Sequence, residues 1–248
     1  RDAGLFALAD GMGGHPEGEV ASQLALQMLA ALFQRAAKPK LENPTRFLNE
    51  AIIAGHHQLL RYATQKALLD TPRTTLVACL LQGNAAYWAH CGDSRLYLVR
   101  GAKLVARTRD HSYSELQDTL RRDVMPAERF NRNVLFTCLG SPGKPVVDTV
   151  GPLLLQRGDR MLLCSDGLWG NVSDAEITDQ LASHPIAGAE PTTGGISPGR
   201  GGTASDQLAA LHIADVVAID ADSAAGDFIT AADERGDGGL AGAGGADE

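Results

Sequence analysis

The sequence lacks the features of several protein classes. None of its apolar stretches reaches the roughly 18 residues that a membrane-spanning helix needs. It has no run of basic residues, and its formal net charge of −8 argues against nucleic acid as the main partner. No internal repeat is visible. We therefore expect a cytoplasmic protein that binds neither a membrane nor nucleic acid.

Cysteines are few, and their spacing excludes the common zinc-binding motifs. The four cysteines show none of the paired spacings of such sites. Three of them lie in apolar, strand-like surroundings, which indicates reduced and buried thiols of a cytosolic protein. The four are Cys79, Cys91, Cys138 and Cys164.

Charge and composition divide the 248 residues into two parts. Residues 217–248 hold eight acidic residues and one basic residue, which leaves a net charge near −1 for the rest. This segment is rich in Gly, Ala and Asp and has little to bury, so it predicts a disordered acidic tail. The hydrophobic content of 44% is enough for one sizeable core, which we place in a domain over residues 1–216.

Apolar periodicity predicts an α+β fold. Two groups of strands, with helices before, between and after them, predict a four-layer αββα sandwich of two mostly antiparallel sheets flanked by helices. Pro16 suits the first position of the first helix. The expected strands are 4–9, 74–81, 85–90, 95–99, 103–106, 153–156, 161–164 and 208–217, and the expected helices are 16–36, 45–68, 112–122 and a short one after a capping box at Ser173.

The most informative segment runs from Leu5 to His15. An apolar strand ends in Asp10, and glycines follow before a helix begins. The strand holds the carboxylate at its carboxyl end, and Gly11 can bring its carbonyl to the same ion. An Asp-Gly pair is more often an ordinary turn, but three further segments favour a metal site. The three are Cys91–Arg95, Cys164–Trp169 and Gly202–Asp206.

Each of these segments contributes one carboxylate, and together they predict a particular chemistry. Carboxylates gathered at strand ends repel one another unless a cation lies between them. Ligands that are all oxygen select Mg²⁺ or Mn²⁺ rather than zinc. Two such ions about 3.5–4 Å apart would bind a phosphate monoester and generate a bridging hydroxide near neutral pH. The four carboxylates are Asp10, Asp93, Asp166 and Asp206.

These segments, in this order, resemble the metal-dependent protein phosphatase family (PPM, also called type 2C) in its bacterial form. The resemblance covers roughly residues 3 to 216. It implies the αββα fold and hydrolysis of phosphoserine and phosphothreonine in proteins by a metal-bridging hydroxide, in opposition to Ser/Thr kinases. It also implies two Mn²⁺ or Mg²⁺ ions, with a third possible, and phosphorylated proteins as substrates. We expect a monomeric domain.

The resemblance also implies roles for single residues. Asp10 would bridge both metal ions, and Gly11 would offer its carbonyl to one of them. Asp166 and Asp206 would ligate the other ion, and Asp93 would join Asp166 at a weaker third site. Asp10 and Asp166 are then the catalytic residues.

Structural alternatives exist for two of these ligands. Asp93 could be a turn residue satisfied by Ser94 and Arg95. Asp206 could be an ordinary cap, because Gln207 stands where the family has Asn.

Other residues near the motifs favour structural roles. His15 is more simply a histidine at a helix entry, and the Asp110-His111 pair more simply forms hydrogen bonds. Trp169 fits core packing.

The sequence departs from the family pattern at its start. The family carries a phosphate-binding arginine and an Asn-Glu-Asp segment upstream of the first metal motif, and this sequence begins too late to contain them. The expected domain is therefore incomplete at its N-terminus. A pseudophosphatase that only binds or regulates, and an inactive fragment without that arginine, are the alternatives to an active enzyme.

Overall fold

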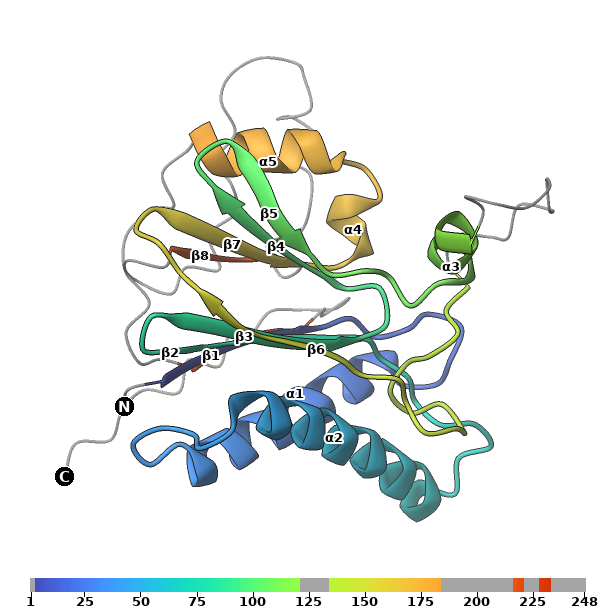
Figure 1. The fold of residues 1–248 in the computed structure, drawn as a ribbon. Coiled ribbons are helices and arrows are strands. Elements are labelled where there is room, and N and C mark those ends of the chain that lie inside the picture. The colour runs from blue at the N-terminus through green and yellow to red at the C-terminus, as the bar shows by residue number, and fades with distance from the viewer. Residues whose placement is uncertain (1–2, 121–133, 184–215, 221–227, 233–248) are drawn as a thin grey trace.

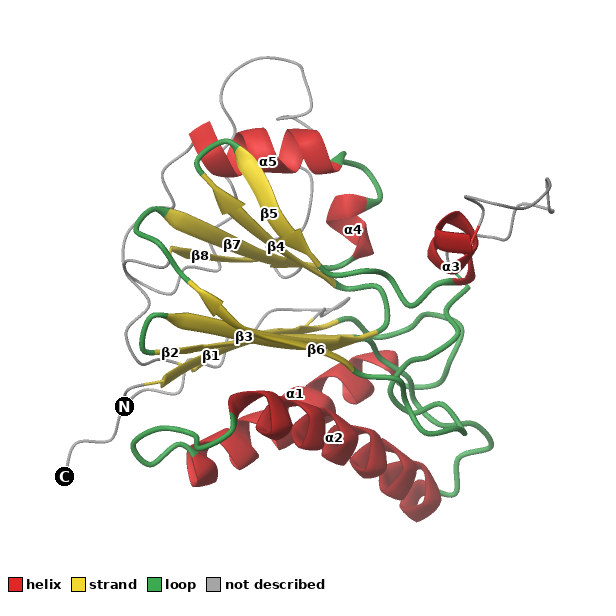
Figure 2. Cartoon of the chain, viewed as in Figure 1, coloured by secondary structure: helices red, strands yellow, loops and turns green. Residues whose placement is uncertain are grey.

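Two sheets lie face to face with helices on both outer sides (Figures 1 and 2). The computed structural model describes residues 3–120, 134–183, 216–220 and 228–232. This arrangement confirms the predicted α+β sandwich of four layers. The elements are β1 (Ala3–Ala9), α1 (Gly18–Ala36), α2 (Pro44–Lys66), β2 (Leu76–Gln82), β3 (Ala85–Cys91), β4 (Arg95–Arg100), β5 (Lys103–Arg107), α3 (Tyr113–Leu120), β6 (Asp148–Leu154), β7 (Asp159–Cys164), α4 (Asp166–Trp169), α5 (Asp174–Ser183), β8 (Val216–Asp220) and β9 (Phe228–Ala232).

The strands divide between two sheets, and the chain crosses between them at one of the sequence motifs. Sheet one has the order β6-β3-β2-β1-β9, and sheet two has the order β5-β4-β7-β8. Neighbouring strands are antiparallel, apart from β1 and β9, which are parallel. Because β3 and β4 belong to different sheets, the turn at residues 92–94 crosses from one sheet to the other.

Burial on both faces explains why β1 reads as a continuous apolar run. Leu5 and Ala7 belong to the core between sheet one and the helices α1 and α2. Phe6 and Leu8, which point the other way, belong to the core between the two sheets. A third core joins sheet two to α4 and α5, and its members include Tyr97, Leu162, Leu168, Ile177 and Leu181.

Two predicted boundaries differ from the structure. Helix α1 begins at Gly18 and not at Pro16, because Glu17 has a left-handed backbone (φ 50°) that no helical residue can adopt. The strand predicted at 153–156 is the end of β6, which starts at Asp148. Most residues of β6 are exposed, and its sequence therefore lacks the apolar alternation that reveals a half-buried strand.

The predicted disordered tail is wrong for two segments. Strand β8 pairs with β7, and β9 pairs with β1. Pairing of this kind uses backbone hydrogen bonds, so a sequence poor in large side chains can still supply a strand. The expected strand at 208–217 overlaps β8 only at its end, and the remainder lies outside the described residues, as does the polar segment 121–133. No described helix is long and apolar enough to cross a membrane.

A chain that ends at Asp220 tests the pairing of β9. Removing β9 leaves β1 at the edge of sheet one, so the thermal midpoint should fall below that of the full chain. Each kcal/mol of lost stability lowers the midpoint by about 2–4 °C in a domain of this size. A chain that ends after Ala232, with β9 intact, is the control. Equal midpoints for all three chains would contradict the pairing.

Candidate active site

Asp10 follows the last residue of β1, and its backbone is held on both sides. Its carbonyl oxygen accepts hydrogen bonds from the Thr75 N–H at 2.9 Å and from the Thr74 hydroxyl at 2.7 Å. Its own N–H donates to the Thr75 hydroxyl at 3.3 Å. These contacts fix the Cα position from which the half-buried carboxylate of Asp10 projects.

The turn after Asp10 is pressed against the first turn of α1. A Cβ atom at Gly11 would collide with the carbonyl oxygen of Gly18. The Met12 N–H donates to the Arg73 carbonyl oxygen at 2.9 Å, on the side opposite the helix. Only glycine fits at position 11, so the Gly11 carbonyl stands free of any side chain of its own.

A single hydroxyl connects this turn with the turn between the two sheets. The oxygen of Thr75 that accepts from Asp10 also lies 2.6 Å from the Ser94 hydroxyl oxygen, and both hydroxyl-bearing residues are buried. Gly92 has φ 107°, and a Cβ there would come within 2.7 Å of the Thr75 Cβ atom. The first two sequence motifs therefore meet at Thr75.

Asp93 is a buried carboxylate in a negative environment. It is 8% exposed. The pKa of Asp93 is raised to about 7, mainly by burial and in addition by the negative charges of Asp166 and Asp110. Asp166, the first residue of α4, is exposed at the end of β7. The second and third motifs thus bring two carboxylates near enough to repel each other.

Arg95 offsets this repulsion only weakly, because its guanidinium is bound to Asp110. Nε and Nη2 each donate to one carboxylate oxygen of Asp110 at 2.7 Å, and both side chains are buried. Ser94 bonds to Thr75 instead of Asp93. These contacts give no support to the alternative in which Ser94 and Arg95 satisfy Asp93 as an ordinary turn residue. They do give Asp110 the structural role expected for it.

Trp169 joins the third motif to the second. Its indole N–H donates to the Asp93 carbonyl oxygen at 2.9 Å, and its ring lies under the Arg95 guanidinium at 3.7 Å from the ring centre. The core packing expected of Trp169 is therefore only part of its role. Sequence reasoning missed this contact, and it also missed the hydroxyls of Thr74 and Thr75. The only signal for the threonines was a hydroxyl pair just before an apolar strand.

Two further sequence predictions concern His15, which follows the Asp10 turn, and Asp206. The His15 imidazole Nδ1 lies 2.9 Å from a carboxylate oxygen of Asp70, a contact that agrees with the structural role expected for His15. This hydrogen bond is the main reason why the pKa of Asp70 is lowered to about 2. Asp206 lies outside the described residues.

The residues present fit a hard divalent cation. The side chains of Asp10, Asp93 and Asp166 and the carbonyl of Gly11 offer oxygen only, the donor that Mg²⁺ and Mn²⁺ prefer. Burial, together with the nearby carboxylates of Asp166 and Asp110, raises the pKa of Asp93, so the ionised form of Asp93 is disfavoured without a cation. A divalent cation beside Asp93 and Asp166 would remove that repulsion. The fold is an αββα sandwich, and the loop carboxylates of Asp93 and Asp166 have the donor chemistry of a site for a divalent cation.

Comparison with known proteins identifies the family. The model of the family described as Protein phosphatase 2C matches residues 1–189. The serine/threonine phosphatase Stp of Listeria welshimeri is 38% identical over 185 residues, which are 72% of each chain. The serine/threonine protein phosphatase PstP of Mycobacterium tuberculosis is 38% identical over 189 residues, which are 75% of this chain and 35% of PstP. This chain belongs to the protein phosphatase 2C family.

Solved structures agree with this assignment. A crystal structure of Mycobacterium tuberculosis PstP superimposes with a TM-score of 0.65 at 32% identity, covering 86% of this chain and 87% of that one. The catalytic domain of PstP in complex with two manganese ions gives a TM-score of 0.63 at 32% identity, covering 86% and 84%.

Replacing Trp169 with Phe tests its link to Asp93. The variant keeps a ring beneath Arg95 but loses the N–H that holds the Asp93 carbonyl. Loss of such a supporting contact should weaken Mn²⁺ binding about 10- to 100-fold in calorimetry. Trp88→Phe, in the core between the sheets, is the control that should change stability and leave Mn²⁺ affinity alone. Equal Mn²⁺ affinity in Trp169→Phe and the unmodified chain would show that Trp169 only packs.

Proposed function

We propose that this chain hydrolyses phosphoserine and phosphothreonine in proteins with the help of Mn²⁺ or Mg²⁺, in opposition to Ser/Thr kinases. The observation that carries the proposal is the approach of Asp93 and Asp166 at the ends of two neighbouring strands of sheet two, while Arg95 is committed to Asp110. Membership of the protein phosphatase 2C family supports the reaction, and the names of its relatives support phosphoserine and phosphothreonine as targets.

The proposed ligands follow from the site. Asp10 and Asp166 are the catalytic residues and ligate two ions, with Gly11 contributing its carbonyl. Asp93 holds a third ion together with Asp166, and Asp206 is the remaining candidate ligand. When bound, such ions polarise the phosphate and lower the pKa of water enough to supply hydroxide at neutral pH.

The chain's own residues position these groups. Thr74 and Thr75 fix the backbone of Asp10, and Trp169 fixes the backbone of Asp93. Hydrogen bonds thus connect the segments that carry Asp10, Asp93 and Asp166. These carboxylates therefore need little reorganisation when cations and substrate bind. Asp166 is exposed, so a phosphorylated segment of another protein can approach from solvent.

The cysteines are unsuited to act as nucleophiles. None of the four forms a disulfide, and all are buried. Burial raises the pKa of both Cys79 and Cys91 to about 12, so neither forms the thiolate that attacks phosphate. Cysteines without disulfides are typical of proteins in a reducing compartment, and we therefore place the protein in the cytoplasm.

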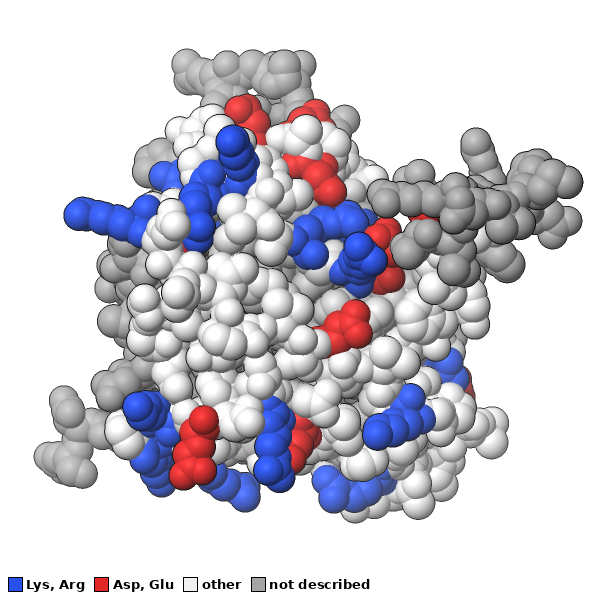
Figure 3. All heavy atoms as spheres, viewed as in Figure 1, with Lys and Arg blue, Asp and Glu red and all other residues white. Residues whose placement is uncertain are grey.

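The proposed partners are phosphorylated proteins, which a monomeric domain would engage one at a time. On the face shown in Figure 3, the described acidic and basic side chains are interspersed. Such a surface offers contacts of both signs to the peptide around a phosphorylated residue.

Activity assays test this function directly. The chain should hydrolyse a small aryl phosphate and a phosphothreonine peptide only when Mn²⁺ or Mg²⁺ is present. EDTA should abolish turnover, and a thiol-alkylating reagent applied to the folded protein should not. Asp166→Asn should lower kcat/KM at least about 100-fold, because removing a ligand costs more than removing its support. Asp179→Asn, an exposed position on α5, is the control.

The result also separates the alternatives. Mn²⁺ binding without any turnover would contradict the enzymatic proposal and support a pseudophosphatase or an inactive fragment. A chain extended at its N-terminus with an arginine and an Asn-Glu-Asp segment of the family's kind distinguishes those two, since only the fragment gains activity by the extension.

A further inference from the structure

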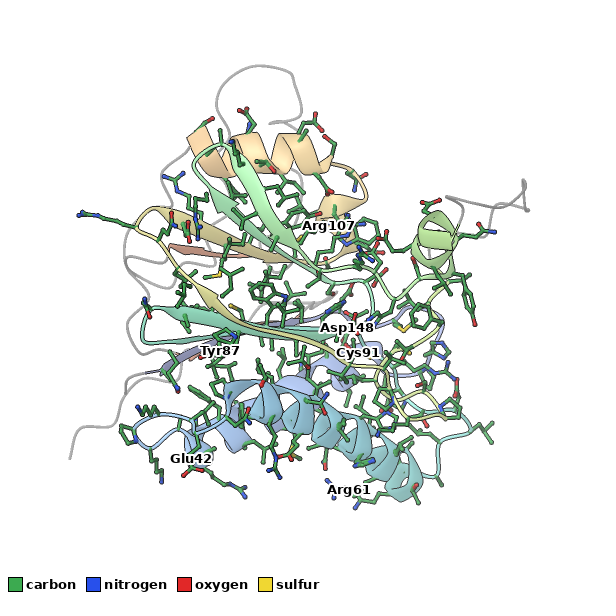
Figure 4. The ribbon with its side chains drawn as sticks, viewed as in Figure 1. Glu42, Arg61, Tyr87, Cys91, Arg107 and Asp148 are labelled. Carbon is green, nitrogen blue, oxygen red and sulfur yellow. The ribbon has the colours of Figure 1, made fainter. Side chains whose placement is uncertain are left out.

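Two buried histidines and one exposed carboxylate face one another outside the proposed catalytic carboxylates. His90 lies near the end of β3 and pairs across sheet one with Asp148, the first residue of β6. His111 comes from the loop between β5 and α3. One ligand atom from each of the three residues lies within 4.8 Å of the others. Figure 4 labels Asp148 on β6, near Cys91 at the end of β3.

One ring nitrogen of His90 is buried without a hydrogen-bond partner, and one of His111 has only Asp148 near it. His90 is 3% exposed and His111 is 4% exposed. The Nδ1 atom of His90 makes no hydrogen bond, and the Nε2 atom of His111 has only a long contact of 3.4 Å with a carboxylate oxygen of Asp148. Buried polar atoms are nearly always satisfied, so the unpaired Nδ1 atom of His90 indicates a missing group that binds to nitrogen.

The other ring nitrogen of His90 sets its tautomer. Nε2 lies 2.7 Å from the Arg109 carbonyl oxygen, which can only accept, so the ring proton is on Nε2 and the lone pair is on Nδ1. A histidine that donates one N–H to a backbone carbonyl and points its other nitrogen elsewhere has the usual arrangement of a metal ligand. Burial lowers the pKa of His90 to about 4, and protons therefore do not compete for Nδ1 at neutral pH.

His111 is the ring that must move to complete the site. Its Nε2 atom lies 3.4 Å from a carboxylate oxygen of Asp148, close to the roughly 3.3 Å between ligand atoms in tetrahedral zinc. The two imidazole rings are 4.5 Å apart between centres and only 22° from parallel. Lone pairs of nearly parallel rings do not converge, so ligation requires a rotation of one ring, and His90 is already fixed by Arg109.

Ligation also shifts the ring proton of His111. In the structure, the Gly92 N–H donates to Nδ1 of His111 at the long distance of 3.2 Å, which places the proton on Nε2. A metal bond to Nε2 moves that proton to Nδ1, and the Gly92 hydrogen bond is exchanged for the metal bond. Gly92 immediately precedes Asp93, so occupancy of this site should be felt in the turn of the proposed catalytic site.

We propose that His90, His111 and Asp148 bind zinc or a similar transition-metal ion, with water as the fourth ligand. Two imidazole nitrogens and one carboxylate are ligands of zinc sites, whereas Asp10, Asp93 and Asp166 offer only oxygen. Asp148 is 54% exposed and gives the ion a path from solvent. The two sites thus select different metals. This inference does not depend on the proposed phosphatase activity, because zinc binding is measured directly.

Titration of the full chain with zinc tests the proposal. Excess Mn²⁺ is present to occupy the oxygen ligands, and a chromophoric chelator reports free zinc. A single zinc should bind, and Asp148→Asn should weaken its affinity at least about ten-fold. His90→Gln should do the same, with circular dichroism to confirm folding. His57→Gln, an exposed histidine on α2, is the control and should bind zinc normally.

A second titration, in the Asp166→Asn variant, shows whether zinc binds at the histidines or at the catalytic carboxylates. In Asp166→Asn the oxygen cluster is impaired, and zinc should still bind with unchanged affinity. The amide signal of Gly92 in a ¹⁵N spectrum should shift on zinc addition in this background. Zinc binding that is lost in Asp166→Asn and retained in Asp148→Asn would place the ion among the catalytic carboxylates and overturn the proposal. So would the absence of any zinc binding.

Discussion

The whole candidate site depends on the hydroxyl of Thr75. Its oxygen accepts from the Asp10 N–H at 3.3 Å and lies 2.6 Å from the Ser94 hydroxyl. Asp10 ends a strand of sheet one, and Ser94 lies in the turn that crosses to sheet two. Two packed sheets touch through apolar side chains, which set a separation but no register. A buried hydrogen bond between their end turns has both distance and direction, and it therefore fixes where the two motifs lie relative to each other.

The fold creates the negative charge of the site and leaves part of it uncompensated. Asp110 is neutralised by a buried bidentate salt bridge with Arg95, whereas the pKa of Asp93 is raised by burial and by Asp166. Replacing Asp93 or Asp166 with an apolar group would relieve repulsion in the metal-free protein. Their presence together makes sense for a site that gains its stability when a cation binds. The Trp169 contact adds the third turn to this unit without adding charge.

The sequence predicts most of the fold but less of the site. The sandwich was predictable because β1, buried on both faces, reads as one apolar run, and because the capping box at Ser173 bonds as expected to Glu176. Strand β9 was not predictable, because a strand held by backbone pairing needs no alternation of apolar residues, and this segment is rich in small residues. The site residues at strand ends were visible as motifs. The contacts that support them were invisible, because Thr75 and Ser94 are 19 residues apart and no periodicity links them.

The central claim is that the described motifs form one metal site, and anomalous X-ray scattering from a crystal grown with Mn²⁺ tests it most directly. Manganese peaks are expected within bonding distance, about 2.0–2.3 Å, of carboxylate oxygens of both Asp10 and Asp166. Such bonding would also bring the Gly11 carbonyl and Asp93 to the edge of the same cluster. Manganese peaks elsewhere, or none near these two aspartates in a crystal soaked at high Mn²⁺, would contradict it.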